Sequence, residues 1–382
     1  WVSGGRKASG TASPTSAPAW PWAAWGGRIQ RLDIDGGVLW EYIFSDANNQ
    51  QHHDICPMPN GNVLLVAWEH KTQAQGVAVG RQNLVGEIWP TQIVEVQPTG
   101  PTSGEIVWEW HLWDHLVQDV NPALPNHGVV SEHPGRMDIN KGSIQSGNGD
   151  WIHVNALDYS PELDQIVFSS NSLDEIYIID HGTTTEEAAG PAGDFLYRWG
   201  NPFNYERPGD HVLWNVHGVN WIDPGMPGEG DLLLFNNGND DNTSDLIQFT
   251  TPMAPDGTYE IQSGQPFAPV PGDYTFFYES PGFHGSHLCG VYRLPNGNTL
   301  ATNGPGLEIR EVDPDGQVVW SHTTPQRVMR ANKYPLDILD PLCTGDLNGD
   351  DTVGVNDLLA VIAAWGNPYT VDDLLLVIQS WG

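Results

Sequence analysis

One stretch of the chain, residues 283–322, carries the complete pattern of a four-stranded antiparallel sheet. Apolar strands are expected at 291–294, 299–302 and 307–312, with a last strand that ends at Trp320, and short turns such as PNGN and PDG separate them. Asn-Gly and Asp-Gly between apolar segments are strong hairpin signals, because tight turns between antiparallel strands require positive φ angles. Four short strands with tight turns form a unit of the size of one β-propeller blade.

The same pattern recurs earlier in the chain, and this recurrence predicts an all-β fold. Units begin at His52, His153 and His217 and end on aromatic residues, whereas residues 28–44 form only the second half of a unit. Repeats of this length are typical of propellers and repeat arrays. We therefore expect a β-propeller of four-stranded antiparallel blades at residues 28–340.

Other segments depart from the repeat. Residues 1–27 are rich in Gly, Ala, Ser, Pro and Trp and are expected to form an extended N-terminal arm. The chain begins at Trp1 and its first blade lacks a first half, which favours a processed or incomplete N-terminus. Residues 110–120 are expected to form a short amphipathic helix. The irregular segment 323–342 is expected to run back across the propeller, and residues 341–382 form a separate small module.

The charge balance limits the partners that the chain can have. Its 382 residues include 15 Lys and Arg against 48 Asp and Glu, a formal net charge of −33. Nucleic acid and anionic membranes repel such a chain and are not expected as partners, and no apolar run is long enough to span a bilayer. The charge fits an extracytoplasmic or high-salt setting with divalent cations as ligands, and simple solubility is the alternative explanation. The odd number of cysteines leaves at least one unpaired, and a bridge between Cys56 and Cys289 is one alternative.

Histidines mark the starts of the repeated units. Because the first strands of propeller blades line a central channel, these side chains are expected to converge there. The candidates are His53, His153, His217, His284, His287 and, as a further candidate, His127. Neutral imidazole serves as a nucleophile, a general base or a metal ligand near pH 7, so the set predicts a catalytic channel or a transition-metal site. For any single histidine, a hydrogen-bonded structural role is the alternative.

An acidic loop followed by a helix opens the C-terminal module. Positions 1, 3, 5, 7 and 12 of an EF-hand-type loop are occupied by Asp346, Asn348, Asp350, Thr352 and Asp357. Oxygen ligands at this spacing surround a hard cation, so we expect a structural calcium ion there. The helix that follows has one apolar face, and a second copy of the helix without a second acidic loop comes after it.

This C-terminal module resembles a type I dockerin, which consists of two such loop–helix repeats. The resemblance implies calcium binding and a protein partner. Two departures weaken the match: Asp351 stands where calcium loops prefer glycine, and the second loop is missing. The alternative is a helical hairpin that caps the propeller.

Most of the propeller region resembles the arylsulfotransferase-like propeller proteins. The matching stretches include QHHDICPMPNGNVLLVAWE, DWIHVNALDYSPELDQIVFSS and VYRLPNGNTLATNGPG. The resemblance implies six blades and a catalytic site in the central channel. It also implies sulfuryl transfer between phenols through a sulfo-histidine without a nucleotide cofactor, with other channel histidines and an arginine holding the sulfuryl oxygens.

The resemblance assigns roles to individual residues. His153 matches the histidine of the His-Val-Asn stretch, His217 matches the histidine that opens the next blade, and the nucleophile is expected at His287 or His284. The family's arginine has no counterpart, because the region 236–245 contains three aspartates and no arginine. This departure matters, since an arginine fork is the natural clamp for a sulfuryl group. Arg293 and Arg198 are the candidates to replace it.

Two functions remain open on these residues. The first is an extracytoplasmic, arylsulfotransferase-like enzyme for a small phenolic or sulfated substrate, in which His153 and His217 assist the nucleophile as acid/base and oxyanion partners. The second is a binding or structural propeller at the cell surface or in an extracellular assembly, tethered through its calcium-binding tail. The histidines favour the first, and the charge and the missing arginine favour the second.

Overall fold

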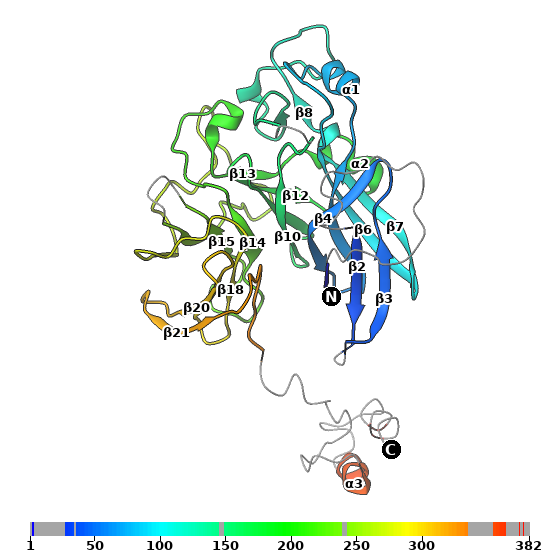
Figure 1. The fold of residues 1–382 in the computed structure, drawn as a ribbon, viewed down its shortest axis with the longest axis vertical. Helices are drawn as coiled ribbons and strands as arrows, with labels where there is room; N and C mark the ends of the chain where they lie inside the picture. Colours follow the sequence, from blue (N-terminus) through cyan, green and yellow to red (C-terminus); the bar gives the residue numbers. More distant parts are fainter. Residues whose placement is uncertain are drawn as a thin grey trace. The chain divides into compact units, whose positions relative to one another are not determined.

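The computed structural model describes residues 2–3, 27–33, 36–144, 149–238, 243–334 and 354–363, and the single residues 374 and 377. The chain forms two compact units, Trp1–Ala331 and Asn332–Gly382, which are described separately. The first unit contains all the strands among the described residues (Figure 1).

Four four-stranded antiparallel sheets follow one another along the chain, each with its strands in sequence order. The first consists of β4 (Asn49–Pro57), β5 (Val63–Glu69), β6 (Thr91–Gly100) and β7 (Ser103–His111). The second consists of β10 (Val154–Ser160), β11 (Gln165–Ser170), β12 (Glu175–Asp180) and β13 (Tyr197–Trp199). The third consists of β14 (His217–Trp221), β15 (Leu232–Asn236), β16 (Asp245–Phe249) and β17 (Phe276–Glu279). The fourth consists of β18 (Cys289–Arg293), β19 (Thr299–Asn303), β20 (Glu308–Val312) and β21 (Val318–Thr323).

The remaining elements are shorter. A three-stranded sheet joins β1 (Val2–Ser3), β2 (Arg28–Leu32) and β3 (Val38–Ile43), and a parallel pair joins β8 (Leu116–Val117) and β9 (Met137–Asp138). The helices are α1 (Gln73–Ala78), α2 (Thr185–Ala188) and α3 (Val355–Ala363), and the 3₁₀ turns are Leu112–Asp114, Val130–Glu132, Pro191–Gly193 and Pro202–Tyr205.

These sheets confirm the predicted all-β propeller of four-stranded antiparallel blades. The described residues contain four complete blades and the three-stranded sheet, so they do not account for the six blades that the resemblance implies. First strands of consecutive blades contact each other in the order β4, β10, β14 and β18. The starts of these strands are therefore brought together, as expected of the inner strands of a propeller.

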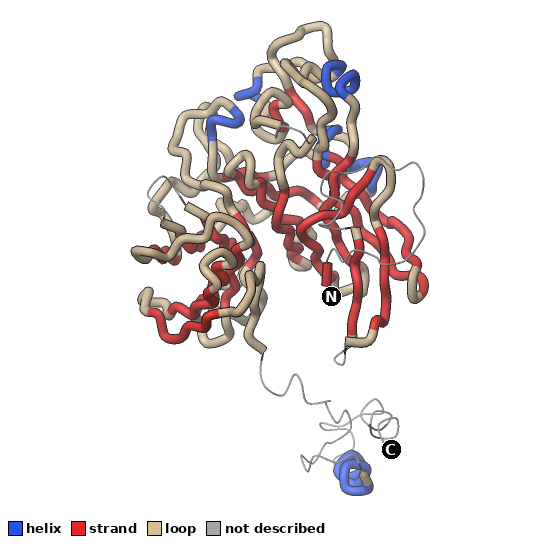
Figure 2. The backbone as a smooth tube through the Cα atoms, viewed as in Figure 1, coloured by secondary structure: helices blue, strands red, loops and turns tan. Residues whose placement is uncertain are grey.

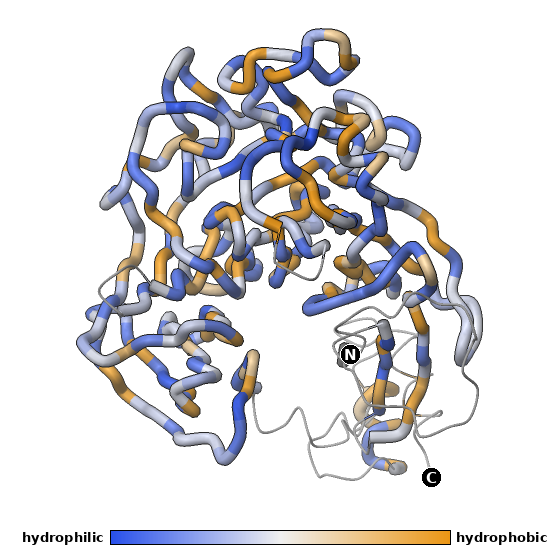
Figure 3. The backbone as a smooth tube through the Cα atoms, turned by 45° about the horizontal axis from the view of Figure 1, so that its top comes forward, coloured by the Kyte–Doolittle hydropathy of each residue, from blue (hydrophilic) through white to orange (hydrophobic). Residues whose placement is uncertain are grey.

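Apolar side chains between neighbouring blades form the core. Figure 3 shows that short hydrophobic segments alternate with hydrophilic ones along the chain. Between the first two blades, Trp110, Trp151 and Phe168 are fully buried in one cluster. The units end on aromatic residues, and Trp110 and Trp199, in the outer strands β7 and β13, are buried in the core. Trp320, by contrast, is 41% exposed, since the whole of β21 faces solvent.

The predicted helix at 110–120 is wrong. That segment begins with the end of β7 and continues with the 3₁₀ turn Leu112–Asp114 and strand β8, which leads into a region that is mostly loop (Figure 2). The four consecutive residues 115–118 are all buried, whereas an amphipathic helix would expose part of such a run, and Leu116 and Val117 pair with β9. The alternative disulfide is also absent, because Cys56 and Cys289 are both free thiols.

The first strands of three blades are distorted at their histidines. Their pairing with the second strands is irregular between Gln51 and Ile55 in β4, in β10 just after His153, and in β14 just after His217. His53 and His153 adopt positive φ angles of 50° and 47°. Such angles are uncommon for residues with a side chain, and they gather at functional sites, where they redirect side chains.

Candidate functional site

Four of the predicted histidines belong to the four contacting inner strands: His53 lies in the irregular middle of β4, and His153, His217 and His287 lie at or just before the starts of β10, β14 and β18. We call these four residues the histidine cluster. The rings of His53 and His153 meet edge to face, with centroids 4.5 Å apart. Burial lowers the pKa of His53 and of His217; the charges that His153 and His217 would carry lower that of His53 further, and the charge of His287 contributes for His217. The fold therefore brings the four rings into one electrostatic group.

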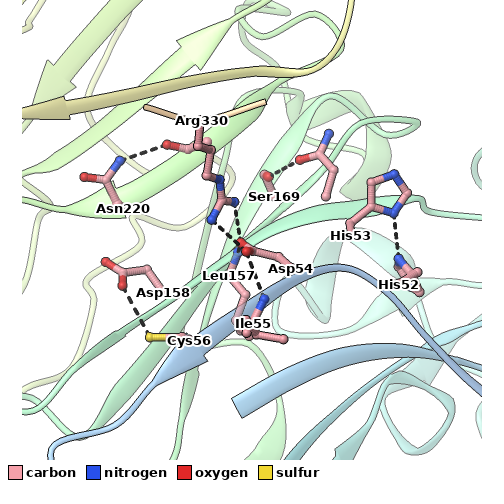
Figure 4. Close-up of polar contacts among 12 residues, drawn as sticks. His52, His53, Asp54, Ile55, Cys56, Leu157, Asp158, Ser169, Asn220 and Arg330 are labelled. Carbon is pink, nitrogen blue, oxygen red and sulfur yellow. Dashed lines mark hydrogen bonds and ion pairs between the residues drawn. The ribbon is translucent and has the colours of Figure 1, made fainter. Parts of the chain in front are cut away.

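His53 has a partner that the sequence analysis missed. The Nδ1 atoms of His52 and His53 lie 2.8 Å apart (Figure 4), so one proton is shared between them. His52 is fully buried and stacks on Trp68 at 4.0 Å, and its Nε2 has no hydrogen-bond partner among the described residues. A buried N–H without a partner is rarer than a buried lone pair without one. We therefore assign the shared proton to His52, which leaves the hydrogen of His53 on Nε2.

Burial fixes the charge of this pair. It lowers the pKa of both His52 and His53 well below the ordinary histidine value, and the neighbouring histidines lower it further. Both rings are neutral at pH 7, so His53 Nε2 is an uncharged hydrogen-bond donor. The His-His dipeptide was the only signal in the sequence for this arrangement.

A carboxylate orients His153. Its Nδ1 bonds Oδ2 of Asp150, which is 5% exposed and also accepts the Trp68 indole N–H through Oδ1 at 3.0 Å. The carboxylate holds the hydrogen on Nδ1, so Nε2 carries the lone pair of the neutral ring and is the nitrogen that can accept a proton and return it. The carboxylate also stabilises the positive charge that the ring gains with a second proton. Asp150 lies in the stretch of sequence that resembles the family, but its role as the partner of His153 could be recognised only from the structure.

Two acceptors fix the tautomer of His217. Its Nδ1 donates to the Asn237 side-chain oxygen at 2.7 Å and to the Asn215 carbonyl at 2.8 Å, so its Nε2 carries the lone pair. Burial lowers its pKa to about 4. Asn237 also donates to the Gly285 carbonyl at 2.6 Å and so ties His217 to the segment that carries His287.

An arginine lies beside His287. Arg327 Nη1 lies 3.2 Å from His287 Nε2, and since a guanidinium only donates, Nε2 accepts and carries the lone pair. The Nδ1 hydrogen then points to Ser286 Oγ, 2.8 Å away. Partial burial and the Arg327 charge lower the pKa of His287. The Cys289 thiol donates to the His287 carbonyl at 3.2 Å and helps to fix the backbone.

His284 is set apart from the histidine cluster. Its Nδ1 is buried next to Gly238 and has no hydrogen-bond partner among the described residues, and its carbonyl accepts the Asn303 amide at 3.0 Å. No ring contact with the other histidines is found in the described part of the chain. His127 likewise lies away from them, paired with Gln118 in the loop after β8.

A second arginine from the end of the first unit enters the same region. Arg330 binds Asp54 through both guanidinium nitrogens, with Nη1 2.6 Å from Oδ1 (Figure 4). Asp54 follows His53 in β4 and also accepts the backbone N–H of Leu157 in β10 at 2.8 Å. This contact confirms, as far as Arg330, that the segment after the last blade runs back across the propeller.

The arginines proposed from the sequence lie elsewhere. Arg198 is fully buried and paired with Glu175 inside the second blade. Arg293 bonds the Gln248 side chain and the Gly297 carbonyl. Neither contacts the histidine cluster, because both side chains point into the blades. Of the acidic region 236–245, residues 239–242 lie outside the described part of the chain.

No group of three or more His, Cys, Asp or Glu among the described residues is arranged to hold a metal ion. The transition-metal alternative therefore gains no support from the histidine cluster. In the tail, Asp346, Asn348, Asp350 and Thr352 lie outside the described residues. Asp357 is buried in α3 and its Oδ2 accepts the Gly354 N–H at 2.8 Å.

The fold and the site together define a class: a β-propeller protein with a cluster of histidines and an adjacent arginine on its inner strands. The Arylsulfotransferase (ASST) family matches residues 19–254 of the 382. The chain belongs to the arylsulfotransferase family. The match covers His53, His153 and His217, whereas His287 and the two arginines lie beyond it.

Solved structures resemble the chain only in outline. A protein of unknown function from Bacteroides caccae shares 13% identity over 77% of this chain and 74% of its own, with a TM-score of 0.38. The β-propeller domain of Myceliophteria thermophila Cps50 (Swd1) shares 11% identity over 78% of this chain and 81% of its own, also with a TM-score of 0.38. A streptogramin B lyase shares 12% identity over 72% of this chain and 54% of its own, with a TM-score of 0.33. Likeness at this level says nothing about activity.

No curated protein matches the chain. Among the described residues, no helix combines the length and the apolar character needed to cross a membrane.

Proposed function

We propose that this protein is an arylsulfotransferase that moves a sulfuryl group from an aryl sulfate to a phenol through a covalent intermediate on His287. Family membership supports the reaction class. The observation that carries the proposal is the position of His287, whose Nε2 lone pair lies 3.2 Å from the Arg327 guanidinium. A neutral nitrogen beside a fixed cation suits attack on a negatively charged sulfuryl group.

The first step transfers the sulfuryl group to the protein. His287 Nε2 forms a bond to sulfur while the bond from sulfur to the phenolic oxygen of the donor breaks. The leaving oxygen takes a proton from protonated His153, whose charge Asp150 stabilises. The donor phenol leaves, and the histidine carries the sulfuryl group without any change in oxidation state.

The second step reverses these roles for the acceptor. Neutral His153 takes the proton of the acceptor hydroxyl as the phenolic oxygen bonds to sulfur and the sulfur–nitrogen bond breaks. His217 has a pKa of about 4 and stays uncharged, so it takes no proton in this step. His53, with its hydrogen on Nε2, donates to a sulfuryl oxygen. The cycle returns every group to its starting state and needs no nucleotide.

The test is a sulfuryl-transfer assay with 4-nitrophenyl sulfate as donor and a phenol as acceptor. Wild type is expected to turn over, and His153→Ala to lower kcat by about 10²–10⁴-fold, the usual contribution of general acid–base catalysis. His322→Ala is the matched control, because His322 is exposed on β21 and its ring stacks on Trp320. No turnover by folded wild type across a panel of donors would favour the alternative, a binding or structural propeller.

The proposal also covers the location of the protein and the function of its C-terminal module. An extracytoplasmic setting, periplasmic, cell-surface or secreted, is supported by the net charge of −33. The dockerin-like tail would bind one structural calcium ion through Asp346, Asn348, Asp350, Thr352 and Asp357 and would dock to a protein partner. Its support is the ligand spacing alone.

Calcium titration of the full chain tests the tail. Isothermal titration calorimetry is expected to find one site in wild type, and Asp350→Ala is expected to abolish it by removing a charged oxygen ligand. Asp315→Ala, in an exposed turn of the last blade, is the control and should bind like wild type. Equal binding by Asp350→Ala and wild type would contradict the calcium proposal.

A further inference from the structure

We propose that residues 324–330, which we call the return segment, form part of the active site, and that Arg327 holds the sulfuryl oxygens during transfer. This inference rests on the proposed function. It assigns the anion-binding cation to a segment that follows the last blade, outside the repeated units. The residues between the third blade's second and third strands, where the resemblance placed an arginine, contain none.

Glycines let the return segment lie directly on the last blade. A Cβ atom on Gly290 in β18 would approach Arg330 Cγ to 3.1 Å and the Met329 carbonyl to 3.2 Å, and a Cβ on Gly304 would approach the Val328 carbonyl to 2.9 Å. Side chains at either position would therefore push the segment away. At its start, the Thr324 N–H donates to the Leu307 carbonyl at 2.8 Å.

The ion pair of Arg330 fastens the other end of the segment. Its partner Asp54 is 5% exposed and is held in turn by the Leu157 N–H, so the segment is tied to the first and second blades as well as to the last. Bidentate pairing of this kind has a fixed geometry and neutralises the charge of Arg330. Arg330 therefore positions the segment and is not free to bind an anion.

Arg327 is the cation that remains available. Among the described residues no carboxylate lies within salt-bridge distance of it, although the chain carries 48 acidic residues. Its one described side-chain contact is His287 Nε2. The guanidinium offers five N–H donors in a plane, so it can release Nε2 and bond two oxygens of a sulfuryl group that approaches that nitrogen. Charge develops on these oxygens during transfer, and a fixed donor there stabilises the transition state.

Arg327 also keeps His287 ready to react. The titratable and charged groups that face His287 among the described residues are Arg327 from the return segment, His217 from β14 and the Cys289 thiol of β18, which donates to the His287 carbonyl. Partial burial and then the Arg327 charge lower the pKa of His287 below its ordinary value. Activity that needs the neutral ring is lost as the pH falls through this pKa. Removing the cation raises the pKa, so the acid side of the pH profile should move to higher pH.

The experiment compares Arg327→Ala, Arg327→Lys and wild type in the sulfuryl-transfer assay across the pH range. Arg327→Ala is expected to lower kcat by about 10²–10³-fold, as the loss of an oxyanion donor does elsewhere, and to shift the acid limb upward. Arg327→Lys should keep the acid limb in place because the charge remains, and should recover only part of kcat because the planar fork is lost. Arg31→Ala, an exposed arginine of β2, is the control.

The outcomes separate this inference from the proposed function. Wild type that transfers no sulfuryl group overturns the proposed function. If wild type is active and Arg327→Ala matches Arg31→Ala in kcat and in the acid limb of the pH profile, the role of the return segment is overturned and the proposed function stands. Thermal melts of each variant check that the fold is intact, which is expected because Arg327 is exposed.

Discussion

Replacing His287 by alanine is expected to lower kcat for sulfuryl transfer by at least about 10³-fold, since loss of the nucleophile in covalent catalysis can cost about 10⁶-fold. The side chain is partly exposed, so the fold should be unaffected. The measurement is the initial rate of 4-nitrophenol release, and near-UV circular dichroism checks that each variant is folded. His322→Ala, in the same blade, should retain the wild-type rate.

The other histidines are poorer nucleophiles for reasons that lie in their contacts. His53 carries its hydrogen on Nε2 and shares the Nδ1 proton with His52, so neither nitrogen offers a free lone pair. His217 is 8% exposed and has a pKa of about 4, which makes its nitrogen a weak base. Among the four rings, only His287 has its lone pair next to a cation. Full activity of His287→Ala, with His217→Ala inactive, would reverse this assignment.

Breaking the buried ion pair of the second blade is expected to cost about 3–5 kcal/mol of unfolding free energy, because the partner left behind is a buried charge. Arg198 and Glu175 are both fully buried, and Arg198 Nε lies 2.9 Å from Glu175 Oε1. Asn204 and Tyr177 also donate to Glu175 Oε2, at 2.9 and 2.8 Å. Arg198→Met leaves this carboxylate without its cation.

Urea denaturation of Arg198→Met and of the double variant Glu175→Met with Arg198→Met measures the effect. The double variant should recover much of the loss, because well-packed apolar side chains replace a buried ion pair at little or no cost. The cation also lies over the Tyr205 ring at 4.4 Å, so some packing is lost in both variants. A single variant that loses less than about 1 kcal/mol would contradict the buried-charge argument.

Local patterns in the sequence were sufficient for the blades. The expected strands at 291–294, 299–302 and 307–312 correspond to β18, β19 and β20 within two residues at each end. Turn chemistry and alternation act over a few residues, so they can be recognised without the fold. Repetition then places the first residues of each unit in equivalent positions, which is why four histidines could be grouped before any contact was known.

Contacts between distant segments were beyond the sequence. Arg330 and Asp54 are 276 residues apart: the sequence predicted that the segment after β21 runs back across the propeller, but no residue in it indicated β4 as the contact. The sequence analysis named Arg198 and Arg293 as candidates to replace the family's arginine. Both lie on strands, where side chains alternate between faces, and the sequence does not tell which face meets the histidines. The expected helix at 110–120 failed for a related reason, since packing against β9 overrides a weak apolar period.

The hydrogen-bond partners of the histidines could be predicted from the sequence only in part. Asp150 precedes His153 by three residues, whereas Asn237 follows its partner His217 by 20 residues, just after β15 of the same blade, so one contact is local and the other is not. Positive φ angles at His53 and His153 turn the rings toward each other, and no residue type announces such angles in a strand. The composition of the site was therefore predictable, and its hydrogen-bond geometry was not.

The most direct test of the account is to look for the sulfuryl group on the protein. Wild type is mixed with 4-nitrophenyl sulfate in the absence of a phenol acceptor, quenched in base, digested and mapped by mass spectrometry. We predict one sulfuryl adduct on the peptide that contains His287, absent from His287→Ala and removed when a phenol is added before the quench. Turnover without any adduct, or an adduct on His284 or another histidine, would contradict the assignment of His287 as the nucleophile.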